Sequence, residues 1–152
     1  MSPDGEQPFH SSNGHVHAVV NGELYDADNI RQRLTKETGA VFKGRSDCEI
    51  VLALYEQHGT GFLQHLRGEF ALCLYDARKR LFMAARDRYG IKPLFFTEVD
   101  GNLLVAAEAK ALAPLGWRPE WDVKSIKERG FTYGTRTLFQ GVQNVRETDI
   151  TC

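Results

Sequence analysis

Three consecutive residues, Asn21-Gly22-Glu23, follow an apolar β-rich run and carry the groups needed to bind a polar ligand. Asn21 offers a carboxamide donor, Gly22 a backbone N–H that a ligand can approach closely because glycine has no Cβ, and Glu23 a carboxylate. Two such donors can stabilise an oxyanion, and the carboxylate can hold an ammonium group. A turn that ends a strand is the simpler interpretation of these residues. Asp47, near a predicted helix N-terminus, could hold an amine or merely complement the helix dipole.

The three cysteines are Cys48, Cys73 and Cys152, and this odd, widely spaced set matches neither a disulfide framework nor a CxxC metal site. We therefore expect reduced thiols. Cys73 lies in an apolar alternating run, which favours a small core residue. Cys48 opens a predicted helix, whose N-terminus could lower the pKa of the thiol. Since no histidine is placed nearby in the sequence, a nucleophilic Cys48 is the less favoured alternative.

Metal and phosphate sites receive little support. The five histidines show no metal-ligand spacing: they are His10, His15, His17, His58 and His65. His15 and His17 could share a strand face, but a zinc site needs further ligands. The segment 86–93 carries three cations and one anion, yet it has a single glycine and no helix directly after it. We interpret it as a loop whose charges pair internally or at an interface, and we expect no metal and no cofactor.

Hydrophobic patterns predict the elements that position these residues. A buried strand over 15–20 is expected to stop at Asn21-Gly22. Ile30 and Leu34 predict a surface helix over 27–38 with Gly39 as its C-cap. The Ser46-x-x-Glu49 spacing is that of a capping box and opens a buried helix. The later predicted elements are a short helix over 62–66, hairpin strands over 69–75 and 80–86, a second hairpin over 93–99 and 102–107, helical turns over 108–115, a helix over 122–128 capped by Asp122, and a final strand within 141–152.

This order of elements is not the regular alternation of a parallel βαβ fold. It predicts an α+β domain with a largely antiparallel sheet. The hairpin strands are apolar on both faces, so the sheet should be covered on both sides, by the early helices on one and by a second sheet on the other. A chain of 152 residues without repeats or a clear linker is expected to form one domain.

Composition narrows the classes of partner. Hydrophobic residues make up 42% and charged residues 26%, as in ordinary globular domains, and the net charge is −1. That charge disfavours nucleic acid and an anionic membrane as partners. The longest apolar stretches run to about six residues, far below the roughly twenty that span a bilayer. The first residues lack the profile of a secretory signal, so we expect a cytoplasmic protein.

Five motifs occur in an order that resembles class II glutamine amidotransferase domains, and they cover almost the whole chain. The closest resemblance is to the glutaminase domain of asparagine synthetases. The motifs are Asn21-Gly22-Glu23-Leu24-Tyr25, Gly44-Arg45-Ser46-Asp47-Cys48-Glu49, Leu66-Arg67-Gly68-Glu69-Phe70-Ala71, Ala85-Arg86-Asp87-Arg88-Tyr89-Gly90-Ile91-Lys92-Pro93-Leu94 and Ala107-Glu108-Ala109-Lys110-Ala111-Leu112.

The resemblance implies an N-terminal nucleophile hydrolase fold, here a partial αββα four-layer sandwich of two antiparallel sheets. In that family a cysteine freed as the first residue attacks the carboxamide of L-glutamine, its own α-amino group acts as the base, and ammonia passes to a synthetase domain. Asn21 and the Gly22 N–H resemble the oxyanion hole. Glu23 and Asp47 resemble the carboxylates that hold the glutamine α-ammonium group.

The start of the chain departs from the family pattern. The family begins Met-Cys-Gly, whereas this sequence begins Met1-Ser2-Pro3 and has no cysteine before Cys48. The segment 2–8 resembles one that follows the first strands and the carboxylate-binding arginine of asparagine synthetases. Residues 1–152 are therefore expected to form a single, N-terminally truncated domain that lacks the nucleophile and any synthetase domain, and to be hydrolytically inactive alone.

Two alternatives stay open. The chain could be a non-catalytic glutamine-binding or protein-interaction module that pairs with a full synthetase or a related chain, because exposed strand edges and uncovered apolar surface favour association. A homo-oligomer is compatible with the same features. It could instead be a marginal domain that aggregates because it lacks central strands.

Overall fold

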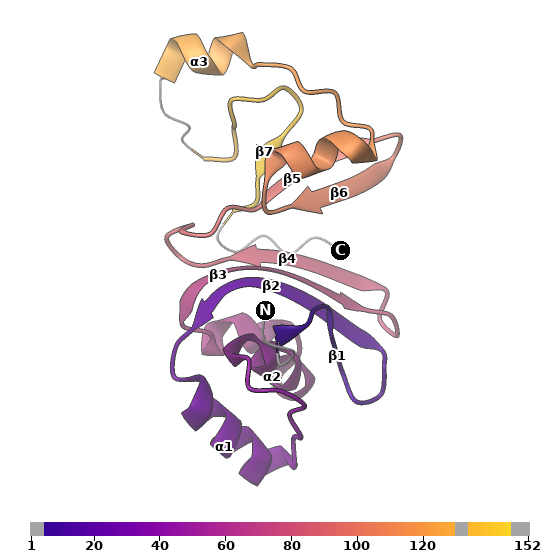
Figure 1. Cartoon of the computed structure of the whole chain (residues 1–152), viewed down its shortest axis with the longest axis vertical. Coiled ribbons are helices and arrows are strands. Elements are labelled where there is room, and N and C mark those ends of the chain that lie inside the picture. Colours follow the sequence, from indigo (N-terminus) through magenta and orange to yellow (C-terminus); the bar gives the residue numbers. More distant parts are fainter. Residues whose placement is uncertain (1–4, 130–133, 147–152) are drawn as a thin grey trace.

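The computed structural model describes residues 5–129 and 134–146. Its larger sheet, called sheet A here, is antiparallel with strand order β1-β2-β3-β4 (Figure 1). The strands of sheet A are β1 (Phe9–His10), β2 (Val16–Leu24), β3 (Gly68–Asp76) and β4 (Leu81–Arg86). Strands β2 and β3 pair along their whole length, from Val16 opposite Asp76 to Leu24 opposite Gly68.

One face of sheet A is covered by the helices of the first half of the chain. These are α1 (Ala27–Thr38), the 3₁₀ turn η2 (Asp47–Glu49), α2 (Ile50–His58) and the 3₁₀ helix η3 (Gly59–His65). In α1, Ile30 and Leu34 lie four residues apart and are both buried, and Gly39 ends the helix with a φ of 71°. The predicted α1 is thus confirmed in bounds, apolar face and C-cap.

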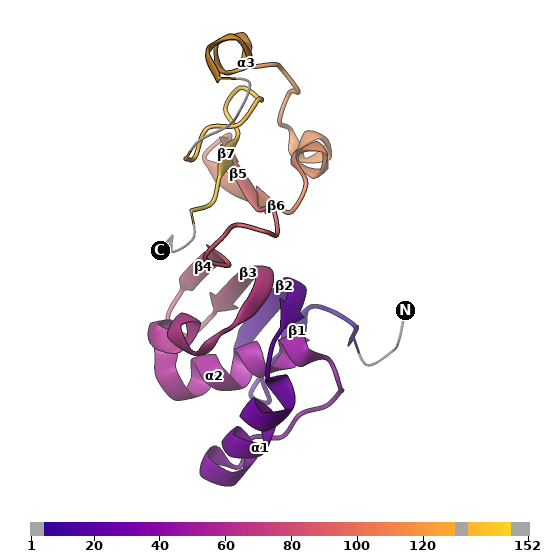
Figure 2. The same cartoon turned by 90° about the vertical axis from the view of Figure 1, so that its left-hand side faces the viewer.

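A second sheet, sheet B, covers the other face of sheet A. Sheet B has strand order β6-β5-β7, formed by β5 (Phe95–Val99), β6 (Asn102–Ala106) and β7 (Gln143–Asn144). Ala71 and Ala84 of sheet A pack in one cluster with Leu94, and Phe96 and Val105 of sheet B adjoin it. On the far side of sheet B lie η4 (Ala109–Leu115) and α3 (Val123–Arg129) (Figure 2). The predicted α+β class and the predicted second sheet are confirmed.

The expectation that Asn21-Gly22 ends the first long strand is wrong. β2 continues to Leu24, and Gly22 lies opposite Phe70 of β3. A Cβ on Gly22, whose φ is 154°, would lie 2.0 Å from the Glu69 backbone oxygen. On the partner strand, a Cβ on Gly68 would lie 2.2 Å from the Glu23 oxygen. These glycines allow the two strands to approach closely, which a local Asn-Gly signal does not reveal.

One of the two predicted helix N-caps is confirmed. The Asp122 carboxylate accepts the Ser125 backbone N–H at 3.0 Å at the start of α3. The Ser46 side chain, in contrast, makes no capping hydrogen bond. The predicted capping box is therefore wrong, because Glu49 is engaged by Lys43 and Gly44 instead.

Two further features concern the remaining parts of the chain. The predicted final strand is represented by the short β7, and residues 147–152 lie outside the described residues. Across the described ranges, the helices are too short or too polar for any of them to cross a bilayer.

Candidate functional site

The first pair of predicted site residues, Asn21 and Glu23, lies on one face of β2. Val20 and Leu24 point into the core beneath α1 and α2, so the alternating positions 19, 21 and 23 face the opposite way, toward the sheet B side. Asn21 lines a gap of about 210 Å³ that Ala71 and Leu94 also border. Both Asn21 and Glu23 are exposed, and within the described residues neither side chain is in a hydrogen bond. Their carboxamide and carboxylate can therefore meet a ligand without breaking an internal contact.

The outer edge of β2 is covered by side chains rather than by a strand. β1 pairs with β2 only at positions 17 and 18. Beyond that point, the Gln7 carboxamide bonds the Val20 N–H at 2.7 Å and the Val20 oxygen at 2.8 Å. Cys48 Sγ lies 3.7 Å from the Gly22 oxygen. Since backbone groups of alternate residues point to the same edge, the Gly22 N–H also faces this edge, beside the Asn21 and Glu23 side chains.

Asp47 is brought to the same end of β2 by tertiary contacts. Its Oδ2 accepts the Leu24 backbone N–H at 2.5 Å, one residue beyond Glu23. A carboxylate has about four acceptor positions, so Asp47 can accept further hydrogen bonds from an ammonium group. Asn21, Gly22, Glu23 and Asp47 thus gather at one end of the β2–β3 ladder.

The segment that carries Asp47 is held by Arg31 of α1. The Arg31 guanidinium donates to the Gly44 oxygen at 2.9 Å and to the Ser46 oxygen, and it pairs with Glu49 at 3.5 Å. Glu49 in turn accepts the Lys43 N–H at 2.6 Å. Sequence reasoning missed Arg31, and no local signal identifies it because its partners lie 13 and more residues away.

Neither cysteine among the described residues, Cys48 or Cys73, provides an activated thiol. Burial, with the neighbouring Asp47 carboxylate, raises the pKa of Cys48 to about 12. The suggestion that a helix N-terminus lowers this pKa is therefore wrong. Burial also raises the pKa of Cys73 to about 11. Both thiols are protonated at neutral pH, and a thiol is a far weaker nucleophile than a thiolate. Cys152 lies outside the described residues.

Within segment 86–93, Arg86 and Asp87 bind backbone groups, whereas Arg88 is exposed. The buried Asp87 carboxylate accepts the N–H groups of Tyr89 at 2.9 Å, Ile91 at 3.1 Å, Lys92 at 3.2 Å and Phe70 at 3.3 Å. Although burial raises the pKa of Asp87, these four amides outweigh burial and hold it below its usual value. The signal available in the sequence was the Asp-x-x-Gly spacing of a turn in which the aspartate bonds its own backbone.

Four of the five histidines form two pairs. His10 and His17 face each other across β1 and β2 with their Nδ1 atoms 2.7 Å apart, and the rings of His58 and His65 stack at 3.8 Å. No group of three or more possible metal ligands occurs among residues 5–129 and 134–146.

The sequence matches the family model described as "Glutamine amidotransferase domain" over residues 1–151. The chain belongs to this family. The asparagine synthetase [glutamine-hydrolyzing] 2 of Bacillus subtilis is 39% identical over 109 residues, which are 72% of this chain and 14% of that protein. The chain is thus a glutamine amidotransferase domain related to the asparagine synthetases.

Other relatives carry a different name. "Amidase chyE" of Penicillium rubens is 50% identical over 145 residues, which are 95% of this chain. The chain spans 21% of the length of that protein. Among solved structures, the glutamine phosphoribosylpyrophosphate amidotransferase of B. subtilis superposes with a TM-score of 0.62 at 26% identity, over 74% of this chain and 27% of that one. The two-sheet architecture is therefore that of the N-terminal nucleophile glutamine amidotransferases.

Proposed function

We propose that the end of the β2–β3 ladder binds L-glutamine and forms half of a glutamine-hydrolysing site. The observation that carries the proposal is the convergence of Asn21, Gly22 and Glu23 with Asp47, whose carboxylate lies on the Leu24 amide at 2.5 Å. An amide donor, a backbone N–H and two carboxylates match the carboxamide and the α-ammonium group at the two ends of glutamine.

Each residue has a distinct role in this proposal. Asn21 and the Gly22 N–H donate to the amide oxygen and stabilise the negative charge that develops on it during attack. Glu23 and Asp47 hold the α-ammonium group. Asp47 is already fixed by the Leu24 amide, so its orientation costs little additional entropy when the ligand arrives.

The described thiols do not supply the nucleophile in this proposal. Cys48 and Cys73 are protonated at neutral pH because burial raises the pKa of each. We therefore expect residues 1–152 alone to bind glutamine without hydrolysing it. The free thiols also agree with the reducing cytoplasmic setting that we propose.

The names of the relatives do not identify a single acceptor for the ammonia that glutamine hydrolysis releases. Relatives with 38–41% identity are named asparagine synthetases, whereas relatives with 49–50% identity are named amidases. Both names concern chemistry at a carboxamide. We propose that the chain serves a synthetase domain or chain that consumes ammonia, with no commitment to aspartate as the acceptor.

Titration of the 152-residue chain with L-glutamine, followed by amide NMR shifts, tests the proposal. We expect saturable shifts at residues 21–24 and 47, with a Kd on the order of millimolar, because only two ends of the ligand are held. Glu23→Gln should weaken binding several-fold. The matched control is Glu98→Gln, an exposed strand glutamate of sheet B, which should bind as the unaltered chain does.

Two outcomes would overturn parts of the proposal separately. Absence of saturable shifts, or equal affinity of the Glu23→Gln variant, would remove the binding site. Release of glutamate above that of a matched Asn21→Ala variant would leave the site intact and contradict only the expected lack of hydrolysis.

A further inference from the structure

A groove adjoins the glutamine end but is lined by none of Asn21, Gly22, Glu23 and Asp47. It lies between two segments that are about twenty residues apart in sequence. Its volume is about 920 Å³. One wall comes from the end of η3 and the start of β3, the other from the loop after β4, and Tyr25 closes it. Tyr25 is fixed there by its backbone N–H, which donates to the Arg67 oxygen at 2.7 Å.

The loop wall is held in place because a buried aspartate and a half-buried arginine bind its backbone. Asp87 accepts four amide hydrogens, three of them from Tyr89, Ile91 and Lys92. From the preceding position, the Arg86 guanidinium donates to the Lys92 oxygen at 2.7 Å and to the Gly90 oxygen. A loop fixed in this way has already lost the conformational entropy that a mobile loop would lose on binding.

This rigid loop presents apolar side chains to solvent. Tyr89 is 81% exposed and Ile91 50% exposed, and across the groove Tyr25 is 45% exposed. A constrained backbone that keeps the Tyr89 ring exposed on a groove that Tyr25 and Ile91 also line leaves apolar surface in water. Exposed apolar clusters of this kind mark interaction surfaces, and tyrosine is enriched at their energetic centres.

The charges around the groove are mainly positive. Arg67 and Arg88 line it and are exposed, and neither takes part in an ion pair in the part of the chain that the structure describes. The acidic residue of the groove, Glu69, already accepts the Tyr25 hydroxyl at 3.2 Å. Two uncompensated guanidinium groups beside tyrosines complement carboxylates that flank an apolar side chain.

We infer that this groove docks a protein segment in which acidic residues flank an aromatic or long aliphatic side chain. The apolar side chain lies against Tyr25, Tyr89 and Ile91, and the carboxylates pair with Arg67 and Arg88. This inference goes beyond the proposed glutamine site and uses none of its residues. The docking groove and the glutamine site can therefore be tested independently.

A selection with the immobilised 152-residue chain against a phage library of random twelve-residue peptides tests the inference. We expect enriched peptides to carry Asp or Glu on one or both sides of an apolar anchor. The affinity of a synthetic copy of the most enriched peptide is then measured by fluorescence polarisation. The Arg67→Gln/Arg88→Gln double variant and the Tyr89→Ala variant should each weaken it about tenfold, and added salt should weaken it several-fold.

The control for the charge change is Arg33→Gln, an exposed arginine of α1 that does not line the groove, which should leave affinity unchanged. Thermal melts confirm that all variants fold, which is expected because the substituted side chains are exposed. No enrichment, enrichment of basic peptides, or equal binding by the groove variants would overturn the inference. Self-association that Tyr89→Ala abolishes would also overturn it, because the occupant would then be a second copy of the chain.

Discussion

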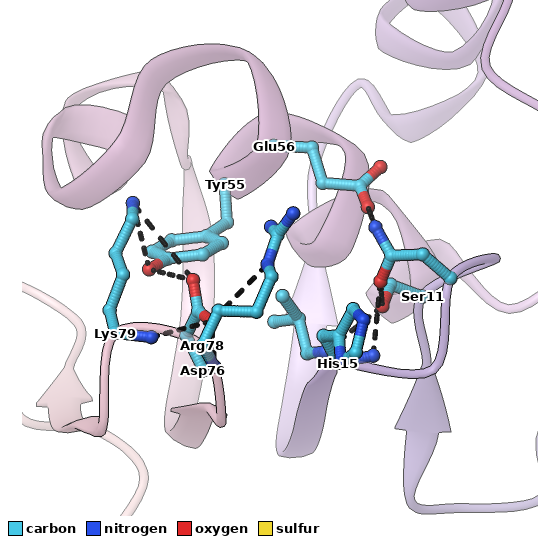
Figure 3. A network of polar contacts seen from close by, with 9 residues as sticks. Ser11, His15, Tyr55, Glu56, Asp76, Arg78 and Lys79 are labelled. Carbon is cyan, nitrogen blue, oxygen red and sulfur yellow. Dashed lines mark hydrogen bonds and ion pairs between the residues drawn. The ribbon is translucent and has the colours of Figure 1, made fainter.

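The two ends of sheet A use buried aspartates in different ways. At the hairpin end, Asp76 is fully buried and accepts the Tyr55 hydroxyl at 3.0 Å and the Arg78 N–H at 2.9 Å, while Lys79 lies 3.9 Å away (Figure 3). At the other end, Asp87 is equally enclosed, but its four partners are all backbone amides. Asp76 thus binds side chains as well as a backbone N–H of the hairpin turn, whereas the hydrogen bonds to Asp87 come from backbone amides.

The difference explains where ligand chemistry can occur. At the hairpin end the polar side chains satisfy one another, so few functional groups remain for a ligand. At the other end Asp87, Arg86 and Arg31 bind backbone groups, with Arg31 also pairing with Glu49, and the side chains of Asn21 and Glu23 are exposed. Stability and binding there depend on different residues, which substitutions can separate.

The largest effect is expected from Gly22→Ala, which attacks the backbone of the glutamine end. The added Cβ would lie 2.0 Å from the Glu69 oxygen and 2.7 Å from the Phe70 Cα, both backbone atoms that cannot move aside alone. We expect a loss of about 3 kcal/mol or more in the free energy of unfolding, measured by urea denaturation. Gly61→Ala is the control, because no atom lies within 4 Å of its Cβ position. Equal stability of the two variants would contradict the close approach of β2 and β3.

Asp87→Asn should have the next largest effect. The substitution replaces one acceptor oxygen by an NH₂ group that faces backbone donors, so at least one buried amide loses its partner. We expect a loss of about 2–3 kcal/mol in unfolding free energy. Hydrogen exchange should show faster exchange at Tyr89, Ile91 and Lys92, but not at the hairpin amides of Arg78 and Lys79. Exchange that rises equally at both ends would show that the two ends are not independent.

Acid should destabilise both ends. Hydrogen bonds to Asp76 and Asp87 outweigh the effect of burial and hold their pKa values below the usual one. A carboxylate whose pKa is depressed in the folded state stabilises it above the unfolded pKa of about 3.9, and that contribution is lost as the pH falls below this value. Urea denaturation between pH 6 and 3 should show this loss, with a shallower decline in Asp87→Asn. An unchanged decline would show that Asp87 does not contribute to it, and Asp28→Asn on the exposed face of α1 is the matched control.

Tyr55→Phe tests the hairpin end alone. It removes the hydroxyl that donates to Asp76 and keeps the ring contact with Phe62, whose centroid lies 5.7 Å away. We expect a loss of about 1 kcal/mol in the free energy of unfolding. Affinity for glutamine should not change, since Tyr55 lies at the opposite end of β3 from Gly22. A change in affinity would mean that the two ends are coupled through the sheet.

Local patterns predicted the elements whose contacts are local, and missed those fixed by distant partners. The bounds of α1 followed from Ile30, Leu34 and Gly39, which act within a few residues of one another. The continuation of β2 through Gly22 depends on β3, about fifty residues later, so an Asn-Gly pair could not reveal it. The raised pKa of Cys48 likewise depends on burial by tertiary packing, which outweighs the local helix position.

The candidate site was predicted in part for the same reason. The Asn21-Gly22-Glu23 run is contiguous, and the resemblance to a family added Asp47, whose place beside Leu24 comes from the fold. The groove between Arg67 and Tyr89 was not predicted, because it combines two segments whose separate sequences indicate only a strand start and a charged loop. Its backbone is held by Asp87, whereas the sequence prediction was a loop whose charges pair internally or at an interface.

The smallest effect on stability is expected from Glu23→Gln, and it is the most informative about the glutamine end. Glu23 is exposed, and among the described residues its side chain makes no hydrogen bond or ion pair, so the free energy of unfolding should change by less than about 0.5 kcal/mol. Loss of glutamine affinity at unchanged stability would separate binding from folding at this end. A variant destabilised as much as Asp87→Asn would instead make Glu23 a structural residue, and the contrast between the two ends of sheet A would fail.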